Sequence, residues 1–395
     1  MAGTEGVKGP LNGVRVVEIG TFVTAPLAAM MLADLGASVI KVENPDGGDP
    51  FRRGNAELYG ANFVAYNHSK KCITLNLREP RGRDVLDRLL RRADVLIENY
   101  RPGVLDKFGF GDSRIATDYP QLIHCSITGF GKDGPYSKRP AYDTVGIALS
   151  GIASLAVDPE NPRIVGPTVA DNVTGMNACM GVLAALYARG KGKQARRVEV
   201  NMLESSIALI PDPIANFTQD GALFGPTSRV AASHTFAFRC SDGELLTVHL
   251  SVPEKFWTGL LEVLQATDTI GSDERFASRR SRIANYHILQ TCLATIVAKH
   301  PRPYWTERLE AADIPFAPIN TIADVMTDPQ VQHLGVFHRV NHPRLGETIC
   351  IRSPIRIDGE RLDAQPAGAL GEHSDEILQD LGYPNEELSA PLSNP

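Results

Sequence analysis

Alternating strand and helix signals in the N-terminal part of the chain constrain its fold most. VRVVEIG (14–20) predicts a short buried strand that ends at a glycine. Residues 24–36 predict a helix with Pro26 in its first turn, and 37–43 predict a second strand. The pattern continues as strand, helix, strand and strand at 72–77, 80–93, 94–99 and 122–129. This alternation predicts an α/β domain with a mostly parallel, Rossmann-like sheet, whose ligands usually bind beyond the carboxyl ends of the strands.

The character of the sequence changes near residue 225. Residues 197–210 still predict a strand that runs into a helix, but 234–250 predict a β-hairpin with Asp242-Gly243 in its turn. Helical segments follow near 254–265, 284–299 and 303–312. Strand character returns at 346–357. We therefore predict a large domain, a smaller α+β domain and a segment that returns to the large domain, at 1–224, 225–330 and 331–395.

Length, charge and cysteine usage limit the class of protein. The 395 residues suffice for two domains, and a formal net charge of −6 gives no reason to expect nucleic acid or an anionic membrane as a partner. The six cysteines contain no CxxC pair, and Cys125 and Cys179 lie in apolar stretches that predict buried thiols. Residues 1–13 show no apolar core of a signal peptide, and no apolar run is long enough to span a membrane. We expect a cytoplasmic protein in a reducing compartment.

The first strand–helix–strand unit invites a dinucleotide interpretation. Glu43 stands about where an acid that binds ribose would lie. The turn before the helix is GTFVTAP, however, and lacks the glycines that let a backbone approach a pyrophosphate. GKGK at 190–193 lacks the strand and the Lys-Ser/Thr of a P-loop. The sequence therefore disfavours NAD, FAD and P-loop nucleotide sites.

One acid stands at the start of the apolar helix predicted in GPTVADNVTGMNACMGVLAALYAR (166–189). The apolar side chains that fall close to one face of this helix are Met176, Met180, Leu183 and Leu186. Asp171 precedes them, and aspartate is among the best residues for an N-cap. A helix N-terminus also favours an ionised carboxylate and offers N–H groups to an oxyanion, while Gly175 would leave room for an acyl group. The residues alone leave the cap and the nucleophile open.

Several blocks, in order along nearly the whole chain, resemble the family III CoA-transferases, whose superfamily includes the α-methylacyl-CoA racemases. The blocks are PLNGVRVVEIGTFVTAPLAAMMLADLGASVIKVENPDGGDPFR, NHSKKCITLNLREPRGRDVL, DVLIENYRPGVLDKFGFG, CSITGFGKDGPYSKRPAYD, VADNVTGMNACMGVLAAL, IPFAPINTIADVMTDPQV and GALGEHSDEILQDLGYP. The resemblance implies an interlocked homodimer of ring-like subunits, each with a large Rossmann-like domain and a small domain. It also places the family's nucleophile at Asp171.

For Asp171 the resemblance implies covalent catalysis on a CoA thioester, with no metal and no permanently bound cofactor. The carboxylate would attack a donor acyl-CoA, giving an aspartyl–acyl anhydride and CoA thiolate. The thiolate would then form an aspartyl-CoA thioester, and a free carboxylic acid would reverse the sequence. Each step exchanges one activated acyl group for another, so no external energy source is needed. Succinyl-CoA is a candidate donor by resemblance alone.

Two alternatives to transfer remain. The racemases use a His–Asp pair, and the histidine position is matched here by Tyr142 in RPAYDTV. A phenol with a pKa of about 10 is a poor base at neutral pH, so Tyr142 favours transfer and is expected beside the CoA chain or the acyl group. The other alternative is a non-catalytic protein that binds acyl-CoA, and the intact Asp171 argues against it.

The resemblance also carries over contacts to CoA, with cations at the phosphates, residues 75–78 along the adenosine, and the turn at 23–24 near the thioester. The predicted set is Val23, Thr24, Asn44, Leu75, Asn76, Leu77, Arg78, Asn99, Tyr100, Arg101, Lys107, Lys138, Arg139 and Tyr142. Lys70 and Lys71 are weaker candidates. For each lysine or arginine the alternative is a solvated surface charge.

The sequence departs from the family pattern in two places. Val23 stands where well-known members have a glutamine that contacts the acyl group, and valine cannot donate that hydrogen bond. VHLSVPEKFW (248–257) lacks the glycine run that shields the intermediates in some members, which leaves His249 and Ser251 as candidates for that task. The candidates to pair with a second carboxylate of a substrate are Arg52, Arg53, Arg229 and His234.

Overall fold

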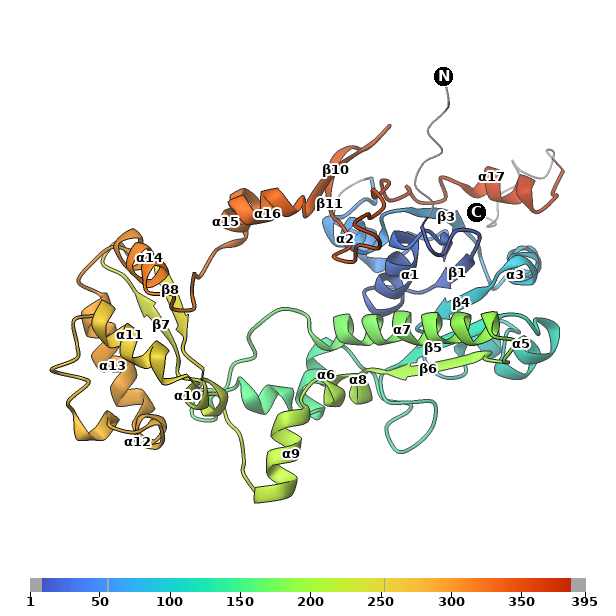
Figure 1. The fold of residues 1–395 in the computed structure, drawn as a ribbon. Coiled ribbons are helices and arrows are strands. Elements are labelled where there is room, and N and C mark those ends of the chain that lie inside the picture. Colours follow the sequence, from blue (N-terminus) through green and yellow to red (C-terminus); the bar gives the residue numbers. More distant parts are fainter. Residues whose placement is uncertain (1–8, 55–56, 252, 385–395) are drawn as a thin grey trace. The chain divides into compact units, whose positions relative to one another are not determined.

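The structure is a computed structural model that describes residues 9–54, 57–251 and 253–384. The chain divides into two compact units (Figure 1). The described parts of 1–152, 166–211 and 332–395 form the first unit, and those of 153–165 and 212–331 form the second. The longer segment of the second unit begins at Asp212, whereas the sequence predicts a boundary near 225. The second unit also contains the short earlier segment 153–165.

Six strands of the first unit form one parallel sheet in the order β3–β2–β1–β4–β5–β6. The strands are β1 (Arg15–Ile19), β2 (Ser38–Glu43), β3 (Lys70–Thr74), β4 (Val95–Glu98), β5 (Ile123–Thr128) and β6 (Arg197–Asn201). The order reverses between β1 and β4, which is the switch point of a doubly wound sheet. The predicted Rossmann-like sheet is confirmed, although β3 begins and ends earlier than the predicted 72–77.

Helices cover both faces of this sheet because successive strand residues point to opposite sides. Val16 packs in a core with α1 (Thr24–Asp34) and α7 (Ala170–Gly190). Val17 packs on the other face, in a core with the helices α3 (Pro80–Arg92), α4 (Val104–Lys107), α5 (Asp112–Asp118) and α17 (Ser374–Asp380). Cys125 and Cys179 are buried in the first of these cores, as predicted.

The contact between α1 and α7 explains which face of α7 is buried. The buried residues are mostly small: Ala170, Thr174, Gly175, Ala178, Cys179, Val182 and Ala185. A Cβ at Gly175 would lie 2.8 Å from the Thr24 carbonyl oxygen. Gly175 therefore serves close helix packing, and the expectation that it leaves room for an acyl group is wrong. Met176 and Met180, expected on the apolar face, are 48% and 56% exposed.

The remaining elements of the first unit lie in the connections and after residue 332. They are η1 (Pro50–Arg52), α2 (Ala61–Asn67), α6 (Asp143–Leu149), α8 (Met202–Ala208), β10 (Phe337–His342) and β11 (Gly346–Ile351). β11 matches the strand predicted from 346, but it pairs antiparallel with β10 in a separate sheet and does not join the six parallel strands.

The second unit has an antiparallel sheet and helices around its own core. Its strands β7 (Thr235–Arg239), β8 (Leu245–His249) and β9 (Phe316–Pro318) pair in that order, so the predicted hairpin is confirmed. Its main helices are α11 (Glu254–Val263), α12 (Arg279–Ala284), α13 (Tyr286–Val297) and α14 (Arg302–Ala311). Shorter elements at its edges are η2 (Ile152–Leu155), α9 (Pro211–Asp220), α10 (Ser228–Ala232), η3 (Glu274–Phe276), α15 (Ile322–Thr327) and α16 (Pro329–Leu334). Phe236, Trp257 and Leu289 lie in the core.

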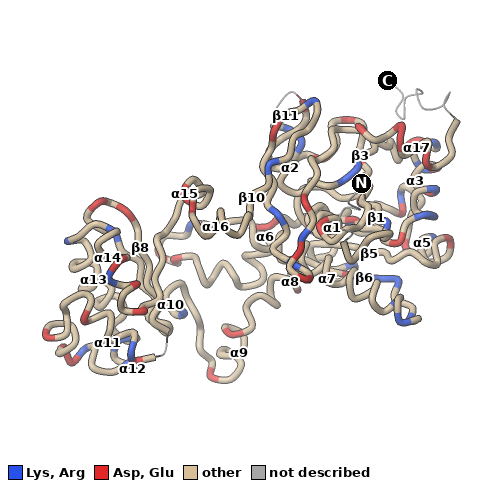
Figure 2. The backbone as a smooth tube through the Cα atoms, turned by 45° about the horizontal axis from the view of Figure 1, so that its top comes forward, with Lys and Arg blue, Asp and Glu red and all other residues tan. Residues whose placement is uncertain are grey.

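Charged residues of both signs are distributed over the two units (Figure 2). This mixture agrees with the small net charge of the sequence. Among the described residues, no helix is long and apolar enough to cross a membrane.

Candidate active site

The loops that follow β1 and β4 meet at the switch point of the sheet, where Asn99 joins them. The Asn99 side-chain oxygen accepts the Thr21 N–H at 3.0 Å. The Asn99 amide nitrogen donates to the Thr21 carbonyl at 2.8 Å and to the Thr24 hydroxyl at 2.9 Å. Asn99 therefore fixes the loop that runs from β1 into α1.

A cavity of about 210 Å³ opens above these loops. It holds Asp171 together with predicted CoA contacts, which are Val23, Thr24, Asn99, Tyr100, Arg101, Arg139 and Tyr142. The sequence places these residues in four separate stretches of the chain. They converge because β1, β4 and β5 end at the same edge of the parallel sheet, while α7 begins there.

Asp171 is the second residue of α7, so the interpretation of it as the N-cap is wrong. Val169 occupies the cap position and makes no side-chain cap hydrogen bond. The backbone N–H of Asp171 is instead satisfied by the Asp143 carboxylate, whose Oδ1 accepts it at 3.1 Å. Asp143 is the first residue of α6 and directly follows Tyr142. A carboxylate from a neighbouring helix thus does the capping.

The carboxylate of Asp171 is held in an environment that opposes its ionisation. Burial, and after it the negative charge of Asp143, raises the pKa of Asp171 to about 6. No hydrogen bond or ion pair reaches its carboxylate from the part of the chain that the structure describes. Raising the pKa makes a carboxylate a stronger nucleophile while it stays ionised at neutral pH.

A second cavity, of about 520 Å³, lies along the carboxyl ends of β2 and β3. Its lining contains the predicted residues Asn44, Leu75, Asn76, Leu77 and Arg78. Tyr100 lines both this cavity and the one that holds Asp171. The two cavities therefore adjoin at one side chain, and together they offer room for an elongated ligand.

Comparisons with known proteins identify the family of this chain. The family model described as CoA-transferase family III matches residues 11–374. The chain belongs to CoA-transferase family III. Succinyl-CoA:glutarate CoA-transferase of Mus musculus is 32% identical over 380 residues, which cover 94% of this chain and 86% of that protein. Succinate–glutarate CoA-transferase of Agrobacterium fabrum is 32% identical over 392 residues, covering 95% and 96%.

A solved structure supports the same assignment. The crystal structure of a CAIB/BAIF family protein from Brucella suis matches with a TM-score of 0.84 and 30% identity, covering 95% of this chain and 100% of that one. The fold, the sequence and the family model thus agree that this protein is a family III CoA-transferase, an enzyme class whose substrates are CoA thioesters.

Some cations predicted for this CoA-transferase do not line either cavity. Lys107 and Lys138 are exposed and are absent from the described lining of both. Lys71 pairs with Glu376 of α17. Arg53 is exposed, and Arg229, His234, His249 and Ser251 belong to the second unit.

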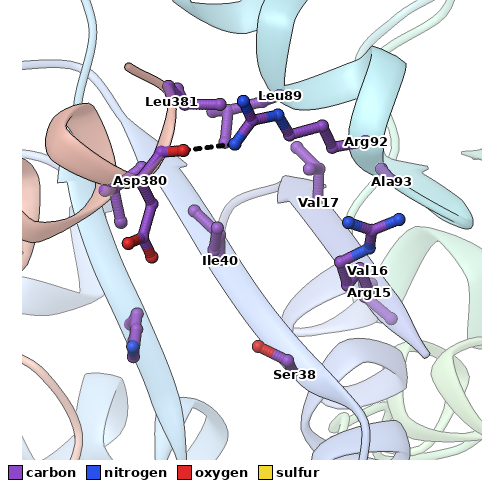
Figure 3. Close-up of a pocket in the computed structure, with 12 residues that line it drawn as sticks. Arg15, Val16, Val17, Ser38, Ile40, Leu89, Arg92, Ala93, Asp380 and Leu381 are labelled. Atoms are coloured by element: carbon purple, nitrogen blue, oxygen red, sulfur yellow. Dashed lines mark hydrogen bonds between the residues drawn. The ribbon is translucent and has the colours of Figure 1, made fainter. Parts of the chain in front are cut away.

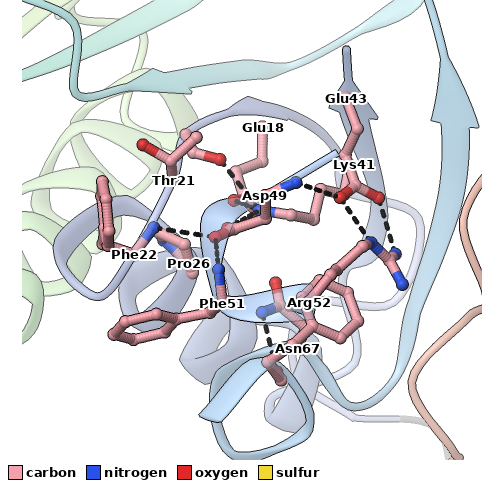
Figure 4. A network of polar contacts seen from close by, with 12 residues as sticks. Glu18, Thr21, Phe22, Pro26, Lys41, Glu43, Asp49, Phe51, Arg52 and Asn67 are labelled. Carbon is pink, nitrogen blue, oxygen red and sulfur yellow. Dashed lines mark hydrogen bonds and ion pairs between the residues drawn. The ribbon is translucent and has the colours of Figure 1, made fainter. Parts of the chain in front are cut away.

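Lys70 and Arg52 cannot act as predicted, because both are buried beside carboxylates. Figure 4 shows Arg52 against Glu43. Lys70 Nζ lies 2.7 Å from Glu18 Oε2. Arg52 makes two contacts of 2.7 Å with the Glu43 carboxylate. These contacts also occupy Glu43, the acid that a dinucleotide site would direct toward a ribose. The predictions for Lys70 and Arg52 fail for the same reason, which is that a buried charge needs a partner of the opposite sign.

The same network continues to the loop after β1. Lys41 Nζ lies 2.7 Å from Glu18 Oε1 and 3.1 Å from Asp49 Oδ2. Asp49 Oδ1 accepts the backbone N–H of Phe22 at 3.2 Å. The three carboxylates of this network thus equal its three cations in number: Glu18, Glu43 and Asp49 with Lys41, Arg52 and Lys70. The network contacts the candidate site through the hydrogen bond to Phe22.

Sequence reasoning missed some residues of the site. Phe22, Thr128, Gly129 and Met202 line the cavity with Asp171, and Asp143 contacts the Asp171 backbone. The glycine that ends the strand at 122–129 marks a strand terminus at the edge where ligands bind, so Thr128 and Gly129 could have been predicted. Phe22 and Asp143 carry no such signal.

A different groove lies at the opposite edge of the sheet (Figure 3). It is lined by Val16, Val17 and Ile40 of β1 and β2, with Leu381 after α17. Arg92 donates a hydrogen bond to the Asp380 carbonyl across it. Lys71, a weaker predicted candidate, lines this groove. The groove faces the amino ends of the strands, however, where doubly wound sheets seldom bind substrates.

A metal centre finds no support in the geometry. Within the residues that the structure describes, no group of three or more His, Cys, Asp or Glu side chains could hold an ion. His124 is buried against Arg197, with its Nδ1 2.5 Å from Arg197 Nη1.

Proposed function

We propose that this family III CoA-transferase moves CoA from an acyl-CoA donor to a free carboxylic acid, with Asp171 as the nucleophile. The observation that carries the proposal is the state of the Asp171 carboxylate. It lies in the cavity at the switch point and has no hydrogen-bond donor among the described residues, while its pKa is raised to about 6. A carboxylate with a purely structural role would be engaged by donors, as Glu18 is.

The proposed reaction proceeds by two exchanges at Asp171. A carboxylate oxygen attacks the donor carbonyl, the C–S bond breaks, and an aspartyl–acyl anhydride and CoA thiolate result. The thiolate attacks the side-chain carbonyl of the anhydride, the donor acid leaves as a carboxylate, and an aspartyl-CoA thioester remains. The acceptor carboxylate attacks that thioester and expels CoA thiolate. The thiolate then attacks the acceptor carbonyl, which releases the new acyl-CoA and free Asp171.

The two adjoining cavities support an extended placement of CoA. We place the adenosine against Asn44 and residues 75–78, and the thioester beside Val23, Thr24 and Tyr142. Tyr100 and Asn99 would flank the chain between them, and Arg101 and Arg139 would meet the phosphates, since guanidinium groups bind phosphate strongly. Lys107 and Lys138 remain predicted phosphate contacts from outside the cavities.

We further propose succinyl-CoA as a donor, because two similar relatives carry succinyl-CoA or succinate in their names.

An interlocked homodimer is supported by the exposed Met176, Met180 and Tyr187, which share one face of α7. A cytoplasmic location is supported by six cysteines that are all free thiols. A monomer in sedimentation at working concentration would contradict the dimer.

The test is to incubate the protein with succinyl-CoA and a panel of free acids and to identify products by mass spectrometry. A new acyl-CoA that appears with the protein and is absent with Asp171→Ala supports transfer through Asp171. The racemase alternative predicts no new acyl-CoA, but deuterium beside the thioester of a branched acyl-CoA in heavy water. Tight CoA binding without either reaction would instead indicate a binding protein.

A further inference from the structure

The loop after β1 carries a strained residue into the cavity that holds Asp171. Phe22 has a φ of +64°, a region that side chains other than glycine rarely occupy. Hydrogen bonds hold the backbone at Phe22 and at the residue before it. The Thr21 N–H is bound by Asn99, and the Phe22 N–H by Asp49. Strain that is fixed in this way at a site points to a purpose for the side chain that it orients.

Asp49 is itself fixed from several directions (Figure 4). Its side chain is buried and pairs with Lys41 at 3.1 Å. Its Oδ1 also accepts the Phe51 N–H at 2.9 Å, and its own N–H donates to Glu43 at 3.0 Å. The Asp49 carboxylate therefore has little freedom to turn. Because it accepts the Phe22 N–H, it fixes the Phe22 backbone relative to the buried network.

The Phe22 ring stands edge-on between two other rings. Its centroid lies 6.0 Å from that of Tyr142 at an interplanar angle of 86°, and 5.3 Å from that of Phe51 at 85°. Phe22 and Tyr142 both line the cavity with Asp171. Val23, Ile127 and Met202 add apolar surface to the same lining. This wall offers aromatic and aliphatic contacts to whatever acyl group reaches Asp171.

We propose that Phe22 is a specificity-determining residue that selects acceptor acids with an apolar, best an aromatic, body next to the carboxylate, and that Asp49 is the positioning residue that holds it there. Edge-to-face contacts with Phe22 and Tyr142 would favour an aryl acyl group. A dicarboxylate gains nothing from these rings. This inference rests on the proposed transfer through Asp171.

The first test uses succinyl-CoA as donor with phenylacetate or glutarate as acceptor, and measures kcat/KM for each new acyl-CoA. We expect phenylacetate to be preferred by about tenfold or more. Phe22→Gly tolerates the positive φ and removes the ring, so it should lower the ratio of kcat/KM for phenylacetate to kcat/KM for glutarate by about tenfold. Preference for glutarate in the unaltered protein, or equal losses for both acids, overturns the inference.

Asp49 is tested through the same ratio in a double-mutant cycle. Asp49→Ala should shift the phenylacetate-to-glutarate ratio in the same direction as Phe22→Gly, and combining the two should add no further shift. Asp49→Asn keeps an acceptor oxygen for the Phe22 N–H and should retain at least half of the selectivity. Additive shifts would show that Asp49 does not act through Phe22.

A binding measurement separates this inference from the proposed function. S-benzyl-CoA and S-(3-carboxypropyl)-CoA are thioethers that cannot react. Their dissociation constants therefore measure contacts with the apolar wall of the cavity separately from the reaction. On the Asp171→Ala protein, we expect S-benzyl-CoA to bind about tenfold tighter than S-(3-carboxypropyl)-CoA. Adding Phe22→Gly to that protein should abolish the difference between the two dissociation constants. Absence of any transfer with this binding preference intact would refute the proposed reaction alone. Equal binding of both thioethers would refute the role of Phe22.

Discussion

The acids of the first unit fall into two groups, which are treated in opposite ways. Glu18 is fully buried, and although burial opposes its ionisation, the ammonium groups of Lys41 and Lys70 outweigh burial and lower its pKa. Asp171 is half-buried, its charged neighbour is another acid, and its pKa is raised to about 6. One carboxylate is stabilised as an anion, and the other, the proposed nucleophile, is not.

The difference shows how this domain separates stability from chemistry. Ion pairs satisfy every charge of the buried network, and that network fixes the loop at Phe22. Asp171 lacks such partners, and a loss of stability at this position is what the proposed role as nucleophile would require. Replacing each acid by its amide should therefore have opposite consequences, and the predictions below test that contrast.

The largest expected effect is on catalysis. Asp171→Asn keeps the shape of the side chain but replaces the carboxylate of the proposed nucleophile by a neutral amide, so the rate of acyl-CoA formation should fall by about 10⁴-fold or more. Product formation from succinyl-CoA, followed by mass spectrometry, measures this loss. Residual activity within tenfold of the unaltered protein would remove Asp171 from the mechanism.

The next effect is on stability. Glu18→Gln leaves the ammonium groups of Lys41 and Lys70 buried without their anion, which should cost about 3–5 kcal/mol of the free energy of unfolding. Urea unfolding measures the loss. Glu376→Gln removes an exposed partner of Lys71 and serves as the control, with an expected change of less than about 1 kcal/mol. Equal effects of both replacements would contradict the contrast between buried and exposed pairs.

The pH dependence of activity tests the raised pKa of Asp171. Only the ionised carboxylate attacks, so kcat/KM should be level above pH 7 and fall about tenfold per pH unit below a pKa of about 6. Initial rates between pH 4.5 and 8.5 measure this limb. A rate that stays level down to pH 5 would show that Asp171 has an ordinary carboxylate pKa in the free enzyme.

Asp171→Asn should also stabilise the fold. Because folding raises the pKa of Asp171 above its unfolded value, the ionised form is penalised in the native state at and above pH 7, and protonation relieves this penalty as the pH falls. The amide variant should therefore gain about 1 kcal/mol at pH 8, and the gain should shrink toward pH 5. Thermal unfolding at both pH values measures it. A variant less stable than the parent at pH 8 would contradict the environment described for Asp171.

The smallest effect concerns Asp143. Asp143→Asn keeps an oxygen for the Asp171 N–H but removes a negative charge, so the pKa of Asp171 should fall. Because burial is the larger cause of the raised pKa, we expect the acid limb to move down by about half a pH unit. The pH–rate profile measures the shift. Movement of the limb to higher pH would show that Asp143 does not act as a negative neighbour.

The sequence by itself determined the sheet and the placement of most of the site. The strand–helix alternation is local, and a parallel sheet must bring the carboxyl ends of its strands to one edge, so the residues after 14–20 and 94–99 had to converge. The ordered blocks added the family and pointed to Asp171. These inferences succeed because they depend on chain order and not on the contacts of individual side chains.

Only the tertiary structure decided which charges are free and which faces are buried. Lys70, Arg52 and Glu43 resemble ligand residues in the sequence, but their partners lie many residues away, and burial forces them to pair. Gly175 is buried and the methionines of α7 are exposed, contrary to expectation, because α1 packs against the small residues of that helix. Asp143 and Phe22 joined the site through contacts made in three dimensions, which no periodicity records.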